Sequence, residues 1–257
     1  MHYRSNINPR EERIDMIFGI RPAIEAILAG KEVDKVLLQD GINGSIIQEL
    51  KELIRERDIP YQYVPQGKLN RLTTKNHQGV VAFVSPIVYQ DLAAVVPQLF
   101  EEGKTPLLLI LDRITDVRNM GAIARTAECT GVHAIIVPSR GSAQLNSDAM
   151  KTSAGALHKI PVCRENNLKD TITYLQECGI QIVACTEKAS DYHFNIDMLS
   201  PTAIIMGSEE DGISPEYLKR CDAKAKLPMT GTIGSLNVSV ACGALLYEVV
   251  RQRMQHV

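Results

Sequence analysis

The chain has 257 residues, a length that suits one large domain or two modest ones. Hydrophobic residues make up 45% of it and charged residues 23%, so it can bury a sizeable core without disulfides or structural metals. The net charge of −2 excludes a global attraction to nucleic acid, and any RNA binding must therefore come from local basic patches.

The N-terminal part of the chain alternates short apolar strands with amphipathic helices, a pattern typical of an α/β domain. We expect this domain to cover residues 14–86. Its first helix is predicted over residues 21–30, where Pro22 suits the first turn. A second helix is predicted over residues 45–57, with Ser45 as its cap, and strands are predicted over 35–38, 61–64 and 79–84.

A basic stretch lies in the second half of this domain. No acidic residue occurs between Asp58 and Asp91, whereas four residues of basic type do, namely Lys68, Arg71, Lys75 and His77. From charge alone, the stretch is either an ordinary solvated loop or a surface that contacts RNA phosphates. We name these four residues as the RNA-binding candidates.

The composition changes at residues 85–105, which contain two prolines and Gly103. We expect residues 87–104 to be a linker, with a helix predicted over 92–101. A second α/β domain is predicted over residues 105–257, beginning with the apolar strand 107–111, which is of the kind buried on both faces of a parallel sheet. Further strands are predicted over 134–137, 181–186 and 202–206, and helices over 120–131, 168–178 and 237–253.

Three polar, glycine-bearing segments follow predicted strands of this second domain. With the last residues of the strands that precede the first two, they cover residues 111–126, 205–213 and 227–239. In open α/β sheets, ligands bind beyond the carboxyl ends of the strands, so these segments are the expected site by position. Asn119 could cap the helix that follows it, and Ser235 or Asn237 could cap the last helix. Taken singly, each feature is better explained as an ordinary turn, a helix cap or a solvated charge than as part of a functional site.

Taken together and in this order, the segments resemble the three motifs of the SpoU (TrmH-type) branch of the SPOUT methyltransferases. The motifs are Asn-x-Gly-x-x-x-Arg-Thr from Asn119, Gly-x-Glu-x-x-Gly from Gly207, and Pro-Met-x-Gly-x-x-x-Ser-Leu-Asn-Val-Ser from Pro228. Residues 18–86 resemble the small, L30e-like substrate-binding domain of the family members that act on ribosomal RNA. The phrase Asn-His-Gln-Gly-Val, which begins at Asn76, is typical of that domain.

This resemblance implies a fold and an activity that the residues alone do not give. The implied fold is a SPOUT domain, an α/β trefoil knot with a parallel sheet, against the general rule that chains are unknotted. The implied activity is methyl transfer from S-adenosylmethionine, without a metal, to the ribose 2′-hydroxyl of a guanosine in 23S ribosomal RNA. The members are homodimers whose active site borrows residues across the interface.

The resemblance also implies roles for individual residues. It places donor contacts, made mostly by backbone atoms, at Gly207, Leu227 and Leu236. It places the polar catalytic positions at Asn119, Arg125, Glu209, Ser235 and Asn237. The family often has glycine where this chain has Glu210. If that position needs a positive φ, Glu210 is strained by about 1 kcal/mol or more; otherwise the loop takes another path.

The resemblance assigns removal of the 2′-hydroxyl proton to Arg125. A guanidinium has a pKa above about 12, and keeping one neutral at pH 7 costs about 1.36 kcal/mol per unit, or about 7 kcal/mol. We therefore favour a charged Arg125 that binds the neighbouring phosphate and the nascent alkoxide while the proton leaves toward phosphate or water. Asn119, Ser235 and Asn237 would then orient the ribose and Arg125.

A dehydrogenase or kinase is disfavoured because the chain has neither GxGxxG after a strand nor GxxxxGK[ST]. An RNA-binding module without catalysis, and the same methylation on tRNA, remain alternatives. Cytoplasmic residence is expected because segment 1–15 has no apolar stretch and run 107–111 is too short to cross a bilayer. The cysteines form no CxxC pair, so free thiols are expected rather than a zinc site.

Overall fold

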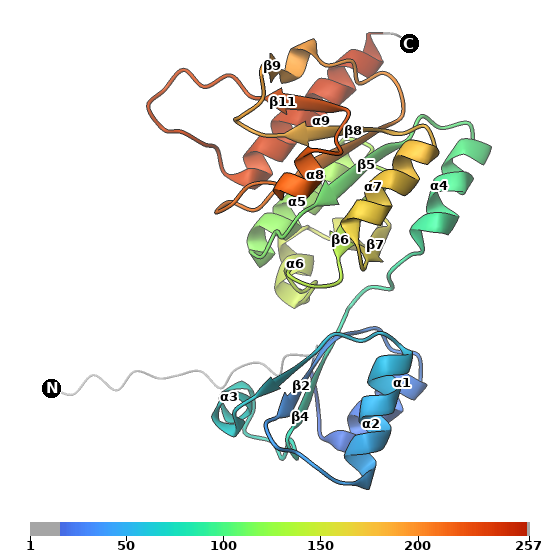
Figure 1. Cartoon of the computed structure of the whole chain (residues 1–257), viewed down its shortest axis with the longest axis vertical. Helices are drawn as coiled ribbons and strands as arrows, with labels where there is room; N and C mark the ends of the chain where they lie inside the picture. Colours follow the sequence, from blue (N-terminus) through green and yellow to red (C-terminus); the bar gives the residue numbers. More distant parts are fainter. Residues whose placement is uncertain (1–15, 256–257) are drawn as a thin grey trace, which may run out of the picture. The chain divides into compact units, whose positions relative to one another are not determined.

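The computed structural model describes residues 16–255, which divide after Pro86 into two compact units (Figure 1). The smaller unit contains a mixed sheet with the strand order β1-β4-β2-β3. Strand β4 pairs antiparallel with both β1 and β2, and β2 pairs parallel with β3. The strands are β1 (Met16–Phe18), β2 (Val33–Gln39), β3 (Tyr61–Val64) and β4 (Val80–Val84).

Helices cover both faces of this small sheet because its strands alternate apolar side chains between the two sides. Helices α1 (Ile20–Leu28) and α2 (Ser45–Glu56) share a core with Val36 and Leu38 of β2. Helix α3 (Gln66–Leu72) packs on the other face, where Leu69 meets Leu37. The predicted helices and strands of this unit are confirmed within a few residues, but β1 and α3 are additions. The expected cap Ser45 is instead the first residue of α2, and Gly44, with φ 138°, precedes it.

The larger unit contains a parallel sheet with the strand order β7-β6-β5-β10-β8-β11-β9. Its central strands are apolar and buried throughout, as predicted for the first of them. The strands are β5 (Leu107–Leu111), β6 (Ala134–Pro138), β7 (Val162–Glu165), β8 (Gln181–Cys185), β9 (Asp191–Tyr192), β10 (Thr202–Met206) and β11 (Ala223–Lys226). The predicted α/β class is therefore confirmed.

Helices cover both faces of the larger sheet as well (Figure 1). On one face lie α5 (Val117–Cys129), α6 (Ser147–Thr152) and α9 (Val238–Met254). On the other face lie α4 (Leu92–Glu101), α7 (Leu168–Glu177) and the short α8 (Pro215–Leu218).

The segment expected to be a linker, residues 87–104, differs from that expectation. Its helix α4 buries Leu92, Val96 and Leu99 in the core of the larger unit, so the segment is part of that unit. Pro97 and the flanking loop residues suggest a linker by composition, but the apolar face of the helix binds it to the sheet.

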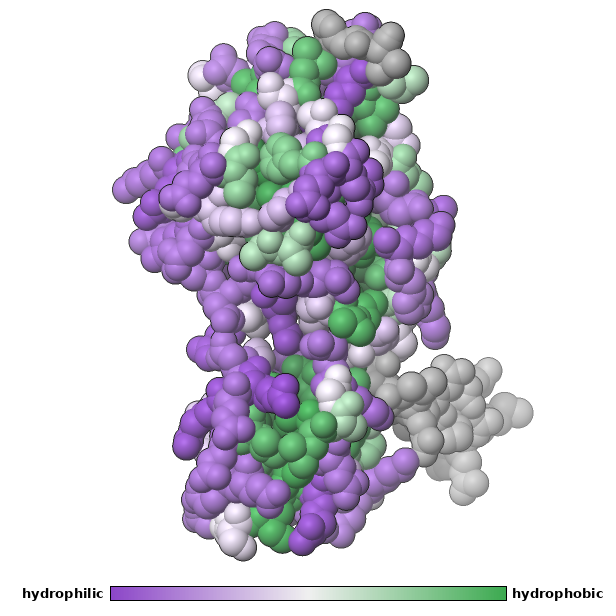
Figure 2. Space-filling model, turned by 90° about the vertical axis from the view of Figure 1, so that its right-hand side faces the viewer, coloured by the Kyte–Doolittle hydropathy of each residue, from purple (hydrophilic) through white to green (hydrophobic). Residues whose placement is uncertain are grey.

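The surface is mixed in character. Figure 2 shows one face on which hydrophilic residues predominate and hydrophobic residues gather in smaller patches. Within residues 16–255, no helix has the length and apolar character needed to cross a membrane. The six cysteines are free; Cys163 and Cys242 are buried, whereas Cys129 is exposed.

Candidate functional site

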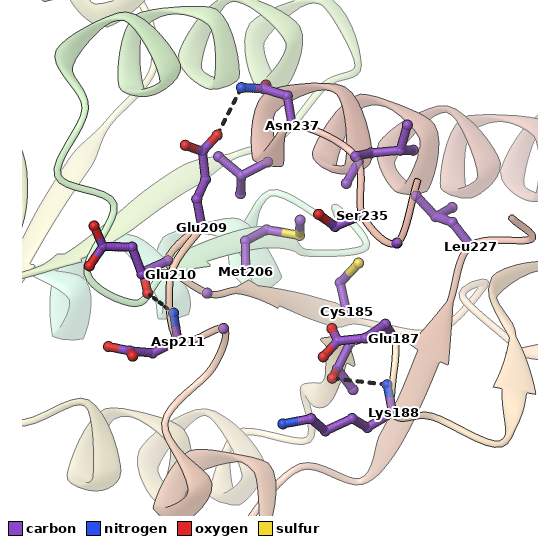
Figure 3. A pocket seen from close by; sticks show the side chains of 18 of the residues that line it. Cys185, Glu187, Lys188, Met206, Glu209, Glu210, Asp211, Leu227, Ser235 and Asn237 are labelled. Atoms are coloured by element: carbon purple, nitrogen blue, oxygen red, sulfur yellow. Dashed lines mark hydrogen bonds between the residues drawn. The ribbon is translucent and has the colours of Figure 1, made fainter. Parts of the chain in front are cut away.

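A cavity of about 620 Å³ lies at the carboxyl edge of the larger sheet (Figure 3). Its walls come from the ends of the adjacent strands β10, β8 and β11, from the loops that follow them, and from the start of α9. This is the edge at which parallel α/β sheets bind ligands. The three residues expected to contact the methyl donor, Gly207, Leu227 and Leu236, all line this cavity.

The lining combines acidic and apolar side chains. Among the described residues, the charged ones in the wall are Glu187, Glu209, Glu210 and Asp211 against a single lysine, Lys188. The apolar ones include Met206, Leu227 and Leu236. A negative wall attracts a cationic ligand, and the size suits a molecule as large as a nucleoside derivative. S-adenosylmethionine carries both a sulfonium charge and an adenine, so the cavity fits this molecule.

The glycine-bearing loop after β10 approaches itself closely. A Cβ atom built on Gly207 would lie 2.1 Å from the carbonyl carbon of Gly212 and 2.1 Å from the nitrogen of Ile213. Ser208 and Gly212 exchange backbone hydrogen bonds of 3.2 and 3.0 Å across this turn. Glycine is therefore required at position 207 for space, and the backbone there is open to the cavity.

The backbone at Glu210 is not strained, although the family's frequent glycine at this position raised that expectation. The non-glycine residues with positive φ within residues 16–255 are Asp58, Gln78, Arg113 and Ala154. In this loop the positive φ, 70°, falls on Gly212, which adopts it without a side-chain clash. The loop thus takes a path in which Glu210 has an ordinary backbone conformation.

The three motifs meet in one hydrogen-bonded cluster beside the cavity. The Oε1 atom of Glu209 accepts hydrogen bonds from Nδ2 of Asn119 at 2.9 Å and from Nδ2 of Asn237 at 2.8 Å. Nδ2 of Asn237 also donates to Oδ1 of Asn119 at 3.0 Å. Figure 3 shows Glu209 and Asn237 pointing toward each other. Residues 90 and 118 positions apart in the chain are thereby fixed in one group.

The first turns of α5 and α9 explain why the side chains of Asn119 and Asn237 can join this cluster. Asn119 was expected to cap its helix, but α5 begins two residues earlier and Asp116 caps it by accepting from the backbone N–H groups of Arg118 and Asn119. Asn119 therefore lies in the first turn, and its amide is free to bind Glu209. Asn237 does cap α9, since its Oδ1 accepts from the backbone N–H of Ser239 at 2.9 Å. The Nδ2 group of Asn237 then faces the cluster.

Two of the expected catalytic residues lie outside this cluster. Ser235 lines the cavity on the loop before α9. Arg125 is exposed on α5 and is not part of the cavity wall. Within residues 16–255, its guanidinium makes no hydrogen bond or ion pair. The chain by itself therefore does not bring Arg125 to the cavity.

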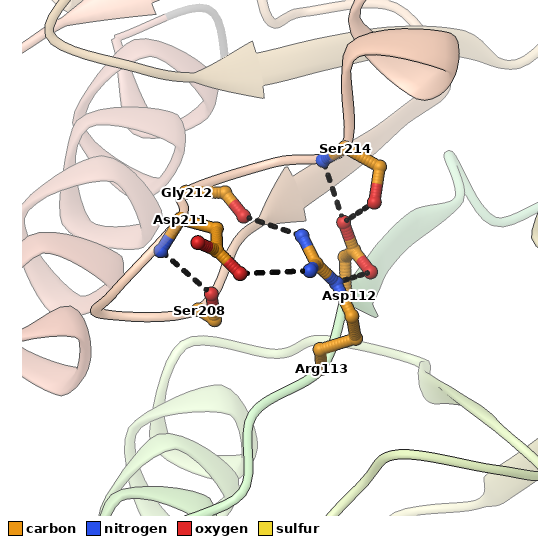
Figure 4. Close-up of polar contacts among 6 residues, drawn as sticks. All are labelled: Asp112, Arg113, Ser208, Asp211, Gly212 and Ser214. Carbon is orange, nitrogen blue, oxygen red and sulfur yellow. Dashed lines mark hydrogen bonds and ion pairs between the residues drawn. The ribbon is translucent and has the colours of Figure 1, made fainter.

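A second polar network, centred on Asp112 and Arg113, supports the loop after β10 (Figure 4), although neither of these two residues belongs to a motif. Asp112 is 2% exposed, and its Oδ2 accepts from the backbone N–H and the hydroxyl of Ser214 at 2.7 and 2.8 Å. Arg113 donates to Asp112, to Asp211 at 3.1 Å and to the Gly212 carbonyl at 3.2 Å. The bond to Asp112 raises the pKa of the Arg113 guanidinium. The position of Asp112, directly after a buried strand, was the sequence signal for this network.

Cys185 also lines the cavity, at the end of β8. Burial, and secondarily the charge of Glu187, raises the pKa of the Cys185 thiol to about 12. A thiol is a good nucleophile only as the thiolate, so Cys185 stays unreactive toward a methyl donor at neutral pH. Cys185 lies in the predicted strand 181–186, and Glu187 and Lys188 follow it; none of the three belongs to a motif, so the sequence does not indicate them as site residues.

The RNA-binding candidates of the smaller unit divide into two kinds. Lys68, Arg71 and Lys75 are exposed, the first two on α3. His77 is only 8% exposed, and both its ring nitrogens are used within the chain. The prediction that His77 contacts a phosphate is therefore wrong, because neither ring nitrogen is free to bind a phosphate oxygen.

No group of three or more His, Cys, Asp or Glu side chains within residues 16–255 has the geometry to hold a metal ion.

Comparisons with known proteins match both units of the chain. The model of the SpoU rRNA methylase family matches residues 106–247, and the model of the RNA 2′-O ribose methyltransferase substrate-binding domain matches residues 16–90. A protein of Staphylococcus saprophyticus named for the TrmH family of tRNA/rRNA methyltransferases is 39% identical over 239 residues. The match covers 93% of this chain and 96% of that protein.

Solved structures match as well. The SpoU methyltransferase AviRb from Streptomyces viridochromogenes, in complex with AdoMet, is 26% identical with a TM-score of 0.60 over 93% of this chain and 90% of its own. An AdoMet-bound rRNA methyltransferase from Sinorhizobium meliloti is 26% identical with a TM-score of 0.60 over 92% and 87%. A TrmH/SpoU tRNA modifying enzyme from A. aeolicus is 30% identical with a TM-score of 0.55, over 64% of this chain and 85% of its own.

Proposed function

The chain belongs to the SpoU rRNA methylase family and is an S-adenosylmethionine-dependent RNA 2′-O-ribose methyltransferase, and from this premise we propose that its substrate is a guanosine of 23S ribosomal RNA. The observation that favours ribosomal RNA over tRNA is the smaller unit. The rRNA methyltransferase from S. meliloti is similar over 92% of this chain, whereas the tRNA modifying enzyme is similar over 64% of it. We also expect the protein in the cytoplasm, where ribosomal RNA is made in bacteria, and the family's trefoil knot in its larger unit.

The chemistry follows from the site. Bound S-adenosylmethionine supplies a methyl group activated by the neighbouring sulfonium charge. The acidic wall, with Glu187 and Glu210, stabilises a cation in the cavity, and the backbone around Gly207 and the side chains of Leu227 and Leu236 hold the remainder. The cluster of Asn119, Glu209 and Asn237 leaves the second N–H of Asn119 and the second carboxylate oxygen of Glu209 to orient a ribose, while the amide of Asn237 holds the cluster together. Ser235 adds a hydroxyl to this rim.

Arg125 completes the site in this proposal, and we infer that it comes from a second copy of the chain. The exposed face of α9 carries Val240, Tyr247 and Met254 at seven-residue spacing, and these side chains are 56%, 58% and 74% exposed. An apolar stripe of this kind is typical of a helix that packs against a partner. Helix α5 lies beside α9, with Gly243 close to Thr126, so Arg125 lies on a helix next to this stripe. A homodimer packed there could offer each cavity the partner's Arg125.

The substrate proposal is tested by transfer of a labelled methyl group. The purified protein is incubated with S-adenosylmethionine and with 23S rRNA, 16S rRNA and tRNA, each taken from cells that lack the gene. We expect label in 23S rRNA at one guanosine, located by blockage of alkaline cleavage at the modified ribose. Label in tRNA alone would support the alternative substrate, and label in none of the three would support a catalytically inactive RNA-binding module.

The basic residues of the smaller unit give a prediction about RNA binding. Lys35 indicates that positive charges gather here, since burial and then the charge of Lys68 lower its pKa. Replacing Lys68 with alanine is expected to weaken binding of all RNA sequences alike, and to reduce the slope of log K against log salt by about 0.7 to 0.9 through loss of one phosphate contact. Fluorescence anisotropy at several salt concentrations measures both quantities. Lys31→Ala, which removes another exposed lysine after α1, should leave the slope unchanged; an unchanged slope in Lys68→Ala as well refutes the assignment.

A further inference from the structure

A second cavity, of about 520 Å³, lies within the smaller unit. Its wall comes from the end of β2, from helix α3 and from the loop 73–79. Amide side chains dominate this wall, and they belong to Gln39, Gln66, Asn70, Asn76 and Gln78. Among the described residues, no carboxylate lines the cavity, and its charged member is Lys75. A wall of neutral amides suits a neutral ligand rich in hydrogen-bonding groups.

His77 fixes the direction of one of these amides. The backbone N–H of Gly79 donates to Nδ1 of His77 at 3.0 Å, so Nδ1 is an acceptor without a proton. The proton of the neutral ring therefore lies on Nε2, which is 2.8 Å from Oδ1 of Asn70 and must donate to it. Because the oxygen of Asn70 is used in this way, its NH₂ group is left to serve the cavity.

Asn76 is oriented by the same kind of constraint. Its Oδ1 accepts from the backbone N–H of Gln78 at 3.3 Å, which again leaves the NH₂ group available. Gln66 lies four residues before Asn70, so both side chains extend from the same face of α3. The oxygen of Gln78 accepts from the backbone N–H of Ile20 and is therefore turned toward α1. The cavity thus presents amide donors from Asn70 and Asn76, with Gln66 beside them.

The loop that carries these donors is held in a fixed shape. Gln78 and Gly79 have φ angles of 48° and 77°, a left-handed pair that a non-glycine residue adopts at a cost. A Cβ atom on Gly79 would lie 2.7 Å from Cδ1 of Ile42, so the turn is also closely packed. Donors on a rigid turn lose little entropy on binding, which favours recognition of a specific partner.

We propose that this cavity binds one unpaired base of the substrate RNA, with the amide NH₂ groups of Asn70 and Asn76 donating to acceptor atoms on the base edge. Proteins read unpaired RNA bases by hydrogen bonds to their edges, and asparagine and glutamine are suited to that task. A nucleotide in a strand is the expected ligand rather than a free base, since the exposed cations Lys68 and Arg71 on α3 and Lys75 in the wall lie where flanking phosphates would pass. The inference rests on RNA being the substrate and adds where one of its bases is held.

The test compares RNA decamers that are abasic except for one central nucleotide, bearing A, C, G or U, with a fully abasic decamer. We expect the full-length protein to bind at least one base-bearing decamer about tenfold more tightly than the abasic one. In Asn76→Asp, one carboxylate oxygen still accepts from Gln78, but the donor toward the cavity is replaced by a second acceptor. Its added charge weakens binding of every decamer alike, so the readout is the ratio between base-bearing and abasic strands, which is expected to fall to about one.

Gln48→Glu is the matched control, because it adds the same charge on the exposed side of α2, against the other face of the sheet. It should keep the wild-type ratio. Equal affinity of the wild-type protein for all five decamers, or an unchanged ratio in Asn76→Asp, overturns the proposal. Failure of the substrate proposal would give a different result: 23S rRNA would receive no methyl group, but the protein would still bind a base-bearing decamer more tightly than the abasic one.

Discussion

Replacement of Arg125 with alanine is expected to lower the rate of RNA methylation by about 10²- to 10⁴-fold, the range found for loss of a group that assists proton transfer or charge stabilisation. Affinity for S-adenosylmethionine should stay within about twofold, because Arg125 does not line the donor cavity. Single-turnover transfer of a labelled methyl group measures the first quantity, and calorimetry with S-adenosylmethionine measures the second. Methylation by Arg125→Ala at a near wild-type rate would make Arg125 a bystander.

The proposed contribution of Arg125 by a partner subunit can be tested with the same variant. In a dimer of one Arg125→Ala subunit and one Glu209→Gln subunit, one cavity keeps its own Glu209 and receives an intact Arg125 from the partner. Co-expressed subunits that pair at random should therefore recover about a quarter of wild-type activity, while each variant alone stays low. If Arg125 acted within its own chain, the mixture would recover nothing.

Arg125→Lys keeps the positive charge of the side chain but loses the planar fork of the guanidinium. Partial methylation activity of this variant would therefore favour electrostatic stabilisation.

The sequence predicted the parallel sheet well because its central strands are unbroken apolar runs. The bounds of β5 and β10 agree with the prediction to the residue. Strand β11, with the sequence Ala-Lys-Ala-Lys, was missed because its pattern is weak and one of its lysines is exposed. Helix α3 was missed because the polar residues Gln66 and Asn70 face the amide-lined cavity rather than a core.

The site was predictable in part for a similar reason. Segments that follow parallel strands must meet at one edge of the sheet, and the Asn119–Glu209–Asn237 cluster forms there. Details that depend on tertiary contacts were not predictable. The competition between Asp116 and Asn119 for the cap of α5 is decided by where the helix begins, and both residue types are good caps. Likewise, the sequence shows a histidine at position 77 within a basic stretch, but it does not show that the ring of this histidine is buried.

The second large effect is expected at Gly207. In Gly207→Ala, the new methyl group would lie 2.1 Å from two backbone atoms of the opposing turn, and backbone cannot swing away as the end of a side chain can. We expect a loss of stability of about 3 kcal/mol or more, at or beyond the upper end of overpacking effects. Because the displaced turn carries Glu209 and part of the cavity wall, affinity for S-adenosylmethionine should fall at least about tenfold. Thermal unfolding and calorimetry measure the two effects.

Gly243→Ala provides the matched comparison in the same unit. A Cβ atom there would lie 3.6 Å from Cγ2 of Thr126, an ordinary van der Waals distance, and the position is inside α9. Alanine in a helix interior is more stable than glycine by about 0.5 to 1 kcal/mol, so this variant should be at least as stable as the wild type and bind the donor normally. The same substitution would thus lower stability at position 207 and keep or raise it at position 243, because only Gly207 faces opposing backbone. If Gly207→Ala bound the donor as tightly as Gly243→Ala, the turn after β10 would not shape the donor cavity.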